Sequence, residues 1–173
     1  MKAMPLAPSG LTTRNLQIIH LSIALLMSLT LHPHHLQQIK THAEHIYPQE
    51  CCGLFLGQHH GDRKIVVEVR PTPNVWAASE ADSLDTTRRY AIDPKDMLIA
   101  QQEGRDRNLN IIGIYHSHPD HPAVPSECDR ACAWTHYSYM IISVRQGVAQ
   151  DCLCWSLNDH HQFQLETLLM AFP

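Results

Sequence analysis

From Ser28 onward the chain alternates short apolar runs with segments that carry an apolar stripe at helical spacing. Short runs rich in β-branched residues favour strands, whereas apolar residues at i, i+3 and i+7 favour a helix. Strands are predicted at residues 28–31, 52–56, 64–69, 110–115, 138–144, 151–157 and 161–168, and helices at 33–46 and 93–107. This alternation predicts a single domain of the α/β (α+β) class, with a mixed β-sheet flanked by helices.

The two predicted helices have recognisable features. Leu36, Ile39 and Ala43 form the apolar stripe of the first. Asp93 is suited to cap the second, because its carboxylate can accept a backbone hydrogen bond and a proline follows it at the first helical position. The connections that we predict are a hairpin turn at 58–62 and a loop at 71–85.

The length and charge of the chain exclude several classes of protein. Its 173 residues are enough for one domain with a core of its own. Its 13 Lys and Arg against 17 Asp and Glu give a formal charge of -4, which is not the basic footprint of a nucleic-acid-binding protein. The six cysteines form no C-x-x-C pair, so we expect free, buried or half-buried thiols and a protein of the reducing cytoplasm.

An apolar run near the N-terminus, residues 18–31, allows three interpretations. It resembles the apolar part of a signal peptide, but no small-x-small cleavage site follows it. It is also shorter than the roughly 20 apolar residues that span a membrane, so no stable membrane insertion is expected. An extra helix, or a start assigned too early with Met27 as the working start, is favoured over the signal peptide. Residues 1–26 are therefore interpreted as an extension and residues 27–173 as the domain.

The segment 115–130, YHSHPDHPAVPSECDR, carries the strongest chemical signal. His116 and His118 follow a predicted buried strand with one residue between them, and residues two apart in an extended chain point to the same face. Asp129 comes three residues after Ser126, as at the start of a helical turn. Two imidazoles and one carboxylate suit zinc, and a zinc ion with three protein ligands keeps its fourth position for water. The segment therefore predicts a catalytic zinc site.

The high histidine content makes the H-x-H pattern alone uninformative. With 14 histidines in the chain, about one H-x-H is expected by chance. We interpret His32-Pro33-His34 as that chance occurrence. The histidines interpreted as surface residues in turns or near element ends are His32, His34, His35, His59, His60, His160 and His161. The signal at His116 and His118 comes instead from the proline, serine and aspartate at fixed offsets after them.

This segment resembles the signature of the JAMM (MPN+) zinc metalloproteases: an upstream glutamate, then H-x-H-P, six residues and S-x-x-D. The residues at 116–119 and 126–129 match it without a gap. Glu50 matches the upstream glutamate, because it lies between the first predicted helix and an apolar strand. The resemblance covers residues 27–168 and is to the short, stand-alone bacterial and archaeal members. It implies the family's fold, which resembles the cytidine-deaminase-like architecture.

The resemblance implies one zinc ion per chain, held by His116, His118 and Asp129. A zinc-bound water loses a proton near neutral pH, and Glu50 is the expected general base that accepts this proton and later returns it to the leaving amine. The Ser126 hydroxyl is expected to stabilise the oxyanion that develops on the substrate. The resemblance also implies a hydrolase that cuts a peptide or isopeptide bond at the C-terminal tail of a ubiquitin-like protein.

Two alternatives stay open. Some bacterial relatives release an amino acid such as cysteine from a ubiquitin-like sulfur carrier, a partner that would end in Gly-Gly. The other alternative is a non-catalytic binding module, as in MPN domains that have lost the metal, although the intact motif argues against it. Cys128 is interpreted as a packed thiol rather than a ligand, and His121 as a solvated loop residue. The loops 71–90 and 119–125 are expected to shape the substrate pocket.

Overall fold

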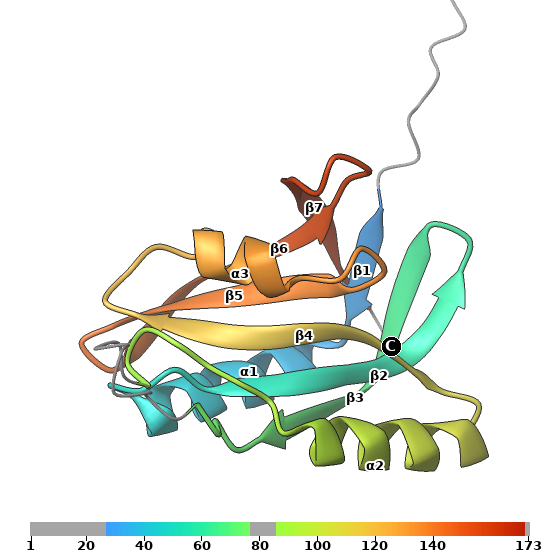
Figure 1. The fold of residues 1–173 in the computed structure, drawn as a ribbon, viewed down its shortest axis with the longest axis horizontal. Coiled ribbons are helices and arrows are strands. Elements are labelled where there is room, and N and C mark those ends of the chain that lie inside the picture. The colour runs from blue at the N-terminus through green and yellow to red at the C-terminus, as the bar shows by residue number, and fades with distance from the viewer. Residues whose placement is uncertain (1–26, 77–85, 172–173) are drawn as a thin grey trace, which may run out of the picture.

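The computed structural model describes residues 27–76 and 86–171. Within these residues, seven strands form a sheet that closes on itself as a barrel (Figure 1). The strands follow one another around the barrel in the order β1-β3-β2-β4-β5-β6-β7. Their bounds are β1 Ser28–Leu31, β2 Cys52–His60, β3 Arg63–Thr72, β4 Asn110–Pro119, β5 Ser138–Arg145, β6 Val148–Leu157 and β7 Phe163–Met170.

The sheet is mixed, as predicted. The strand β1 pairs in parallel with β3 and β7, and β4 pairs in parallel with β5, whereas the other neighbours are antiparallel. The short strand β1 closes the barrel, because Ser28 lies opposite Arg63 on one side and Thr167 on the other. The sequence does not predict this closure, since the composition of a short strand indicates its conformation but not its two partners.

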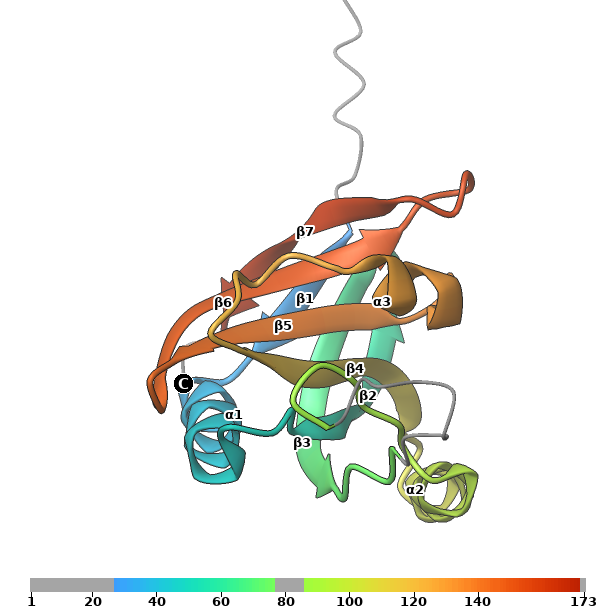
Figure 2. The same ribbon diagram turned by 60° about the vertical axis from the view of Figure 1, so that its left-hand side comes forward.

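The described residues contain three helices, α1 Pro33–Ile46, α2 Pro94–Asp106 and α3 Glu127–Cys132, of which α1 and α2 pack on the strands. The first two begin where the sequence predicts them. Asp93 caps α2 through its Oδ1, which accepts a 2.8 Å hydrogen bond from the backbone N of Lys95. In Figure 2, β2 and β3 lie between α1 and α2. The two longer helices therefore cover different faces of the strand layer.

The core consists of clusters on both faces of the central strands. The larger cluster packs Ile39 of α1 against Tyr115 of β4 and Met140 of β5. A second cluster packs Ala100 of α2 against Leu54 of β2 and against neighbours on β4. Because β4 is covered on both faces, its apolar sequence is nearly continuous, as is typical of a buried strand. This packing fixes the position of β4, which carries the predicted ligands His116 and His118 near its end.

Several boundaries differ from the prediction. The strands β2 and β3 extend further than expected, so their turn contains only Gly61 and Asp62 rather than 58–62. Gly61 has φ +61°, a conformation that favours glycine. The strand β4 continues to Pro119, and β7 begins at Phe163, two residues later than predicted. These differences move the boundaries of the strands without changing their order along the chain.

Two predictions of exposure are wrong. His35 is only 7 % exposed, because it lies on the inner face of α1 with Ile39. Cys132 is exposed, whereas all cysteines were expected to be at least half-buried. The predicted extension at 1–26 and residues 77–85 of the predicted loop lie outside the described residues. Within the described ranges, no helix is long and apolar enough to cross a membrane.

Candidate metal centre

His116, His118 and Asp129, the three residues that the sequence predicts as ligands, converge at the end of β4. One potential ligand atom from each lies within 4.8 Å of the other two. The Nε2 atoms of the two histidines are 3.1 Å apart. Oδ1 of Asp129 is 3.2 Å from Nε2 of His116, and its Oδ2 is 3.6 Å from Nε2 of His118. In the part of the chain that the structure describes, no other group of three such side chains could hold a metal ion.

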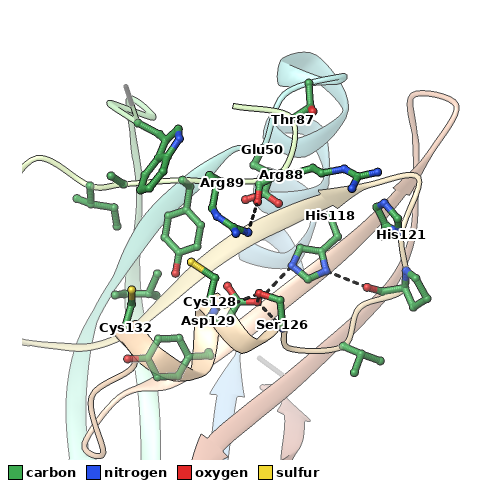
Figure 3. Close-up of a pocket in the computed structure, with 18 of the residues that line it drawn as sticks. Glu50, Thr87, Arg88, Arg89, His118, His121, Ser126, Cys128, Asp129 and Cys132 are labelled. Atoms are coloured by element: carbon green, nitrogen blue, oxygen red, sulfur yellow. Dashed lines mark hydrogen bonds and ion pairs between the residues drawn. The ribbon is translucent and has the colours of Figure 1, made fainter. Parts of the chain in front are cut away.

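The strand β4 orients the two histidines. Both lie within the regular strand, which ends at Pro119, so their side chains share one face. His116 lies opposite Cys52 of β2 in the sheet. Nδ1 of His118 donates a 2.9 Å hydrogen bond to the carbonyl oxygen of Pro122 (Figure 3). This bond selects the tautomer in which Nε2 is free to bind a metal ion.

Burial and pairing set the protonation states of the group. His116 is 0 % exposed, and desolvation lowers its pKa, which favours the neutral imidazole. Burial acts in the same direction on His118, but hydrogen bonds to Asp129 and to the Pro122 carbonyl outweigh it and raise the pKa of His118. Burial opposes ionisation of Asp129, yet the two histidines outweigh it and hold the pKa of Asp129 well below its usual range. Because only the neutral ring of His118 can bind a divalent cation, the raised pKa makes binding weaken as the pH falls.

Ser126 and Asp129 build the start of α3. The backbone N of Asp129 donates to Oγ of Ser126 over 3.1 Å, and the backbone N of Ser126 donates to Oδ2 of Asp129 over 2.6 Å. This reciprocal pair is a capping box, so the predicted helical turn is present. The Ser126 hydroxyl also donates to Oδ2 over 2.6 Å. The cap therefore orients the carboxylate that faces the histidines and places a hydroxyl beside it.

Glu50 lies between α1 and β2 and lines the same cavity as His118 and Ser126 (Figure 3). Its side chain is buried, with the residue 6 % exposed. Burial raises the pKa of Glu50 to about 8; His118 and Arg89 oppose this rise and Asp129 adds to it. Glu50 does not belong to the group of three converging side chains. It is thus a carboxyl beside the group rather than a part of it.

The raised pKa of Glu50 predicts a pH-dependent stability of the metal-free protein. A carboxyl whose pKa rises from 4.5 to about 8 on folding stabilises the fold at low pH, and this contribution is lost as the pH rises through that interval. We expect the metal-free Glu50→Gln protein to unfold at a higher temperature than wild type at about pH 8, and at nearly the same temperature at about pH 5. Thermal unfolding with a chelator present measures this. The same difference at both pH values would contradict it.

His118 and Asp129 of this group line a cavity of about 530 Å³, whereas His116 is buried behind it. Residues 87–92 line one side, and His121 and Val124 line another. Residues 87–90, His121 and Val124 belong to the two loops that the sequence predicts to shape the pocket, whereas Ala91 and Ile92 lie just beyond the first of them. Cys128 of α3 and Trp134 after it form a third wall, which was not predicted. The cavity is therefore bounded by segments from three separate parts of the chain.

Two residues of the site carry no signal in the sequence. The ring of Tyr90 stacks on the ring of His116, with centroids 4.4 Å apart and planes at 23°. Arg89 lines the cavity beside Glu50, and its guanidinium points into it in Figure 3. Both precede the cap of α2 in a segment without a periodic pattern. Only the folded structure brings them to the metal centre.

Cys128 and His121 line the cavity without joining the converging group. Cys128 is half-buried, and burial raises the pKa of its thiol, which favours the uncharged form. His121 is exposed, as expected for a solvated loop residue. Neither observation adds a fourth side chain to the group.

The donor set suits zinc, because imidazole nitrogen and carboxylate oxygen are two of its common ligand types and one tautomer of His118 already leaves its Nε2 free. The fold and this group define an α+β domain with a candidate metal centre at the end of a buried strand. A family model described as prokaryotic homologs of the JAB domain matches residues 32–158. The protein belongs to this family, which confirms the resemblance to the JAMM/MPN proteins.

Several curated relatives have names that describe an activity. The protein is similar to the desampylase of Haloferax volcanii, with 32% identity over 97 residues, which are 56% of this chain and 63% of the relative. It is also similar to a Thermus thermophilus protein described as "Probable TtuB-protein conjugate cleaving protease", with 31% identity over 106 residues, 61% of this chain and 64% of the relative. In both cases the match spans slightly less than two thirds of the relative.

A solved structure supports the fold class. The solution structure of a protein from Desulfitobacterium hafniense matches with a TM-score of 0.70 and 26% identity. The match covers 84% of this chain and 94% of the other. The mixed α+β class that the sequence predicts is therefore confirmed.

Proposed function

We propose that the protein is a zinc-dependent metallopeptidase that hydrolyses a peptide or isopeptide bond at the C-terminal tail of a ubiquitin-like or sulfur-carrier protein. The observation that carries this proposal is the convergence of His116, His118 and Asp129 beside a cavity that His118, Asp129 and the buried Glu50 line. Three protein ligands leave one position of a tetrahedral zinc ion for water, which is the arrangement of a catalytic centre.

The residues of the chain would divide the reaction among them. A zinc ion held by His116, His118 and Asp129 would supply a water that ionises near neutral pH and a positive charge beside the reacting carbonyl. Glu50 accepts the proton of that water and later gives it to the nitrogen of the leaving amine. Burial raises the pKa of Glu50 in the metal-free protein, and the charge of a bound zinc ion would lower it again, which would keep the carboxylate available as a base near neutrality.

Ser126 would act on the oxygen of the substrate. Its hydroxyl donates to Oδ2 of Asp129, but that oxygen also accepts from the backbone N of Ser126. The hydroxyl can therefore turn away without leaving the carboxylate unsupported. In the turned position it donates a hydrogen bond to the oxyanion that forms as the carbonyl is attacked.

The names of the relatives support a protein conjugate as the substrate: one is a desampylase and the other a protease that cleaves TtuB-protein conjugates. We propose a tail that ends in Gly-Gly, because residues without side chains let a backbone approach a metal centre closely. Trp76, Tyr90 and Trp134 give the cavity broad apolar surfaces on which the rest of the tail can lie. Cytoplasmic action is part of the same proposal.

A comparison of three substrates tests the function. A single ubiquitin-like protein would be joined through its C-terminal glycine to a lysine side chain, to the N-terminus of a reporter protein, or to one free amino acid. We expect the zinc-loaded protein to cleave at least one of them, a chelator to stop cleavage and added zinc to restore it. The preferred substrate identifies the leaving group. If no substrate is cleaved at full zinc occupancy, the proposed activity is wrong and the non-catalytic binding module is favoured.

A further inference from the structure

Asn74 joins Glu50 to the wall of the cavity through one side-chain amide. Its Nδ2 donates to the carbonyl oxygen of Glu50 over 3.0 Å and to that of Arg89 over 2.9 Å. Its Oδ1 accepts from the backbone N of Trp76 over 3.0 Å and from that of Ala91 over 3.1 Å. Both donors and the acceptor oxygen of the amide are thus used, and every partner is a backbone group.

We infer that Asn74 is a positioning residue that sets Glu50 against the metal centre. The inference rests on the proposed function, in which Glu50 transfers protons, and it adds a residue to which neither the motif nor the family resemblance assigns a role. Asn74 follows β3 and is half-buried, and it does not belong to the converging group of three. It acts through the backbone of Glu50 and does not touch the reacting atoms.

The backbone of Glu50 has no regular secondary structure to hold it. It lies in the connection after α1 and before β2. Its N donates to the carbonyl oxygen of Thr86 over 2.7 Å, and its carbonyl oxygen accepts from Asn74. Both bonds thus come from the chain that follows β3. These loop contacts act together with the bonds of the neighbouring Cys51 to Ser117 in setting the position of the Glu50 carboxyl against the metal centre.

The side-chain amide of Asn74 also holds the segment that covers His116. Asn74 bonds to the carbonyl of Arg89 and to the N–H of Ala91, the two neighbours of Tyr90. The ring of Tyr90 stacks on His116. A further hydrogen bond, from the backbone N of Val75 to the carbonyl oxygen of Ala91, links the same two segments. One amide therefore ties the proposed general base and the ring that covers a predicted ligand to the same point.

The hydrogen bond from Asn74 to Glu50 affects the reaction rate in this proposal, because proton transfer is sensitive to distance. A displacement of about 1 Å of a catalytic group can lower the rate roughly 100-fold. A side chain that only stabilised the loop would use the bonds to Trp76 and Ala91, which hold the loop to itself. The donated bond to Glu50 leaves the loop and reaches the residue that carries the chemistry. The two functions can therefore be separated by substitution.

Two variants of Asn74 distinguish support of the loop from support of Glu50. Asn74→Asp keeps an acceptor for Trp76 and Ala91 but loses both donated bonds, whereas Asn74→Ala loses all four. Asn158→Ala is the matched control: Oδ1 of Asn158 also accepts from two backbone N–H groups, those of His160 and Gln162, in the turn between β6 and β7. Zinc content, thermal unfolding, kcat and KM would be measured on the full chain, with the substrate that the wild type cleaves.

We expect both Asn74 variants to lower kcat roughly 10- to 100-fold, with KM and zinc content close to wild type. The control should unfold at a lower temperature but keep its kcat. Wild-type kcat in Asn74→Asp would overturn the inference. A loss of kcat that only follows lost zinc or lost folded protein would also overturn it, because the role would then be structural.

Hydrogen exchange does not require catalytic activity, so it tests the role of Asn74 separately from the proposed function. The Glu50 amide donates to the carbonyl oxygen of Thr86, and Asn74 holds the carbonyl oxygen of the same residue, Glu50. Hydrogen exchange at this amide should become faster in both Asn74 variants and stay unchanged in Asn158→Ala, since of the two asparagines only Asn74 bonds to the backbone of Glu50. If the wild type cleaves no substrate, the proposed function fails while this measurement still decides whether Asn74 holds Glu50. Unchanged exchange in the Asn74 variants would refute the inference in either case.

Discussion

Replacement of Glu50 by glutamine should lower kcat by roughly 100- to 10,000-fold, the contribution typical of a general acid–base residue, while the protein keeps its zinc. The amide has almost the shape of a protonated carboxyl but cannot accept a proton at neutral pH. Zinc should stay bound because Glu50 is not one of the three side chains that converge. Steady-state kinetics and zinc content, measured on the same sample, test both statements.

Glu50→Asp is the matched control for this substitution. It keeps a carboxyl group but shortens the side chain, so we expect a rate between those of wild type and Glu50→Gln. Activity of Glu50→Gln at the wild-type level would remove Glu50 from the mechanism, and loss of zinc would make it a ligand. The inactive variant can also serve as a trap, because it should retain substrate without cleaving it. Failure to enrich any protein with a ubiquitin-like tail would place the substrate class in doubt.

The group of three could be predicted because its members are local in sequence. His116 and His118 lie on one strand, and a capped turn returns Asp129 to them after a short loop. Strand periodicity and capping chemistry are properties of neighbouring residues, so a single sequence contains them. The geometry of this group agrees with the spacing from which it was predicted.

The position of Glu50 beside the histidines could not be predicted from local sequence patterns. Nothing local connects it to the histidines, and only the family resemblance indicated that they belong together. In the structure, Cys51 provides the connection: its backbone N donates to Oγ of Ser117 over 2.8 Å, and its carbonyl oxygen accepts from the backbone N of Ser117 over 3.1 Å. Since Ser117 separates the two histidines, this contact places Glu50 beside them. Register between distant strands cannot be read from periodicity alone.

Local sequence patterns likewise did not predict the closure of the barrel or all the walls of the cavity. The strand β1 shows the composition of a strand, but its pairing with both β3 and β7 depends on how the whole sheet curves. Tyr90 and Asn74 lie in connections, where conformation follows from tertiary contacts rather than from a pattern. Sequence reasoning therefore indicated the candidate site residues by type, by spacing and by family resemblance, and it missed Tyr90 and Asn74, whose places depend on tertiary contacts.

Replacement of Asp129 by asparagine should weaken zinc binding by more than the roughly 10- to 100-fold that loss of an outer-shell partner costs, because a charged ligand is removed. The helix α3 should persist, since an amide oxygen can still accept from the backbone N of Ser126 as Oδ2 does now. Competition with a chelator of known zinc affinity measures the first effect. Circular dichroism and thermal unfolding measure the second.

Ser126→Ala is the control that separates the two tasks of this turn. It removes the hydroxyl that donates to Asp129 and caps the helix, but it leaves the three converging side chains intact. We expect nearly normal zinc affinity and a kcat lower by roughly 100-fold, the loss typical of one oxyanion donor. If Asp129→Asn bound zinc as tightly as wild type, Asp129 would have to be a cap alone, and the third ligand would have to be sought elsewhere along the cavity. If Ser126→Ala lost zinc as well, the hydroxyl would act by orienting the carboxylate rather than by contacting the substrate.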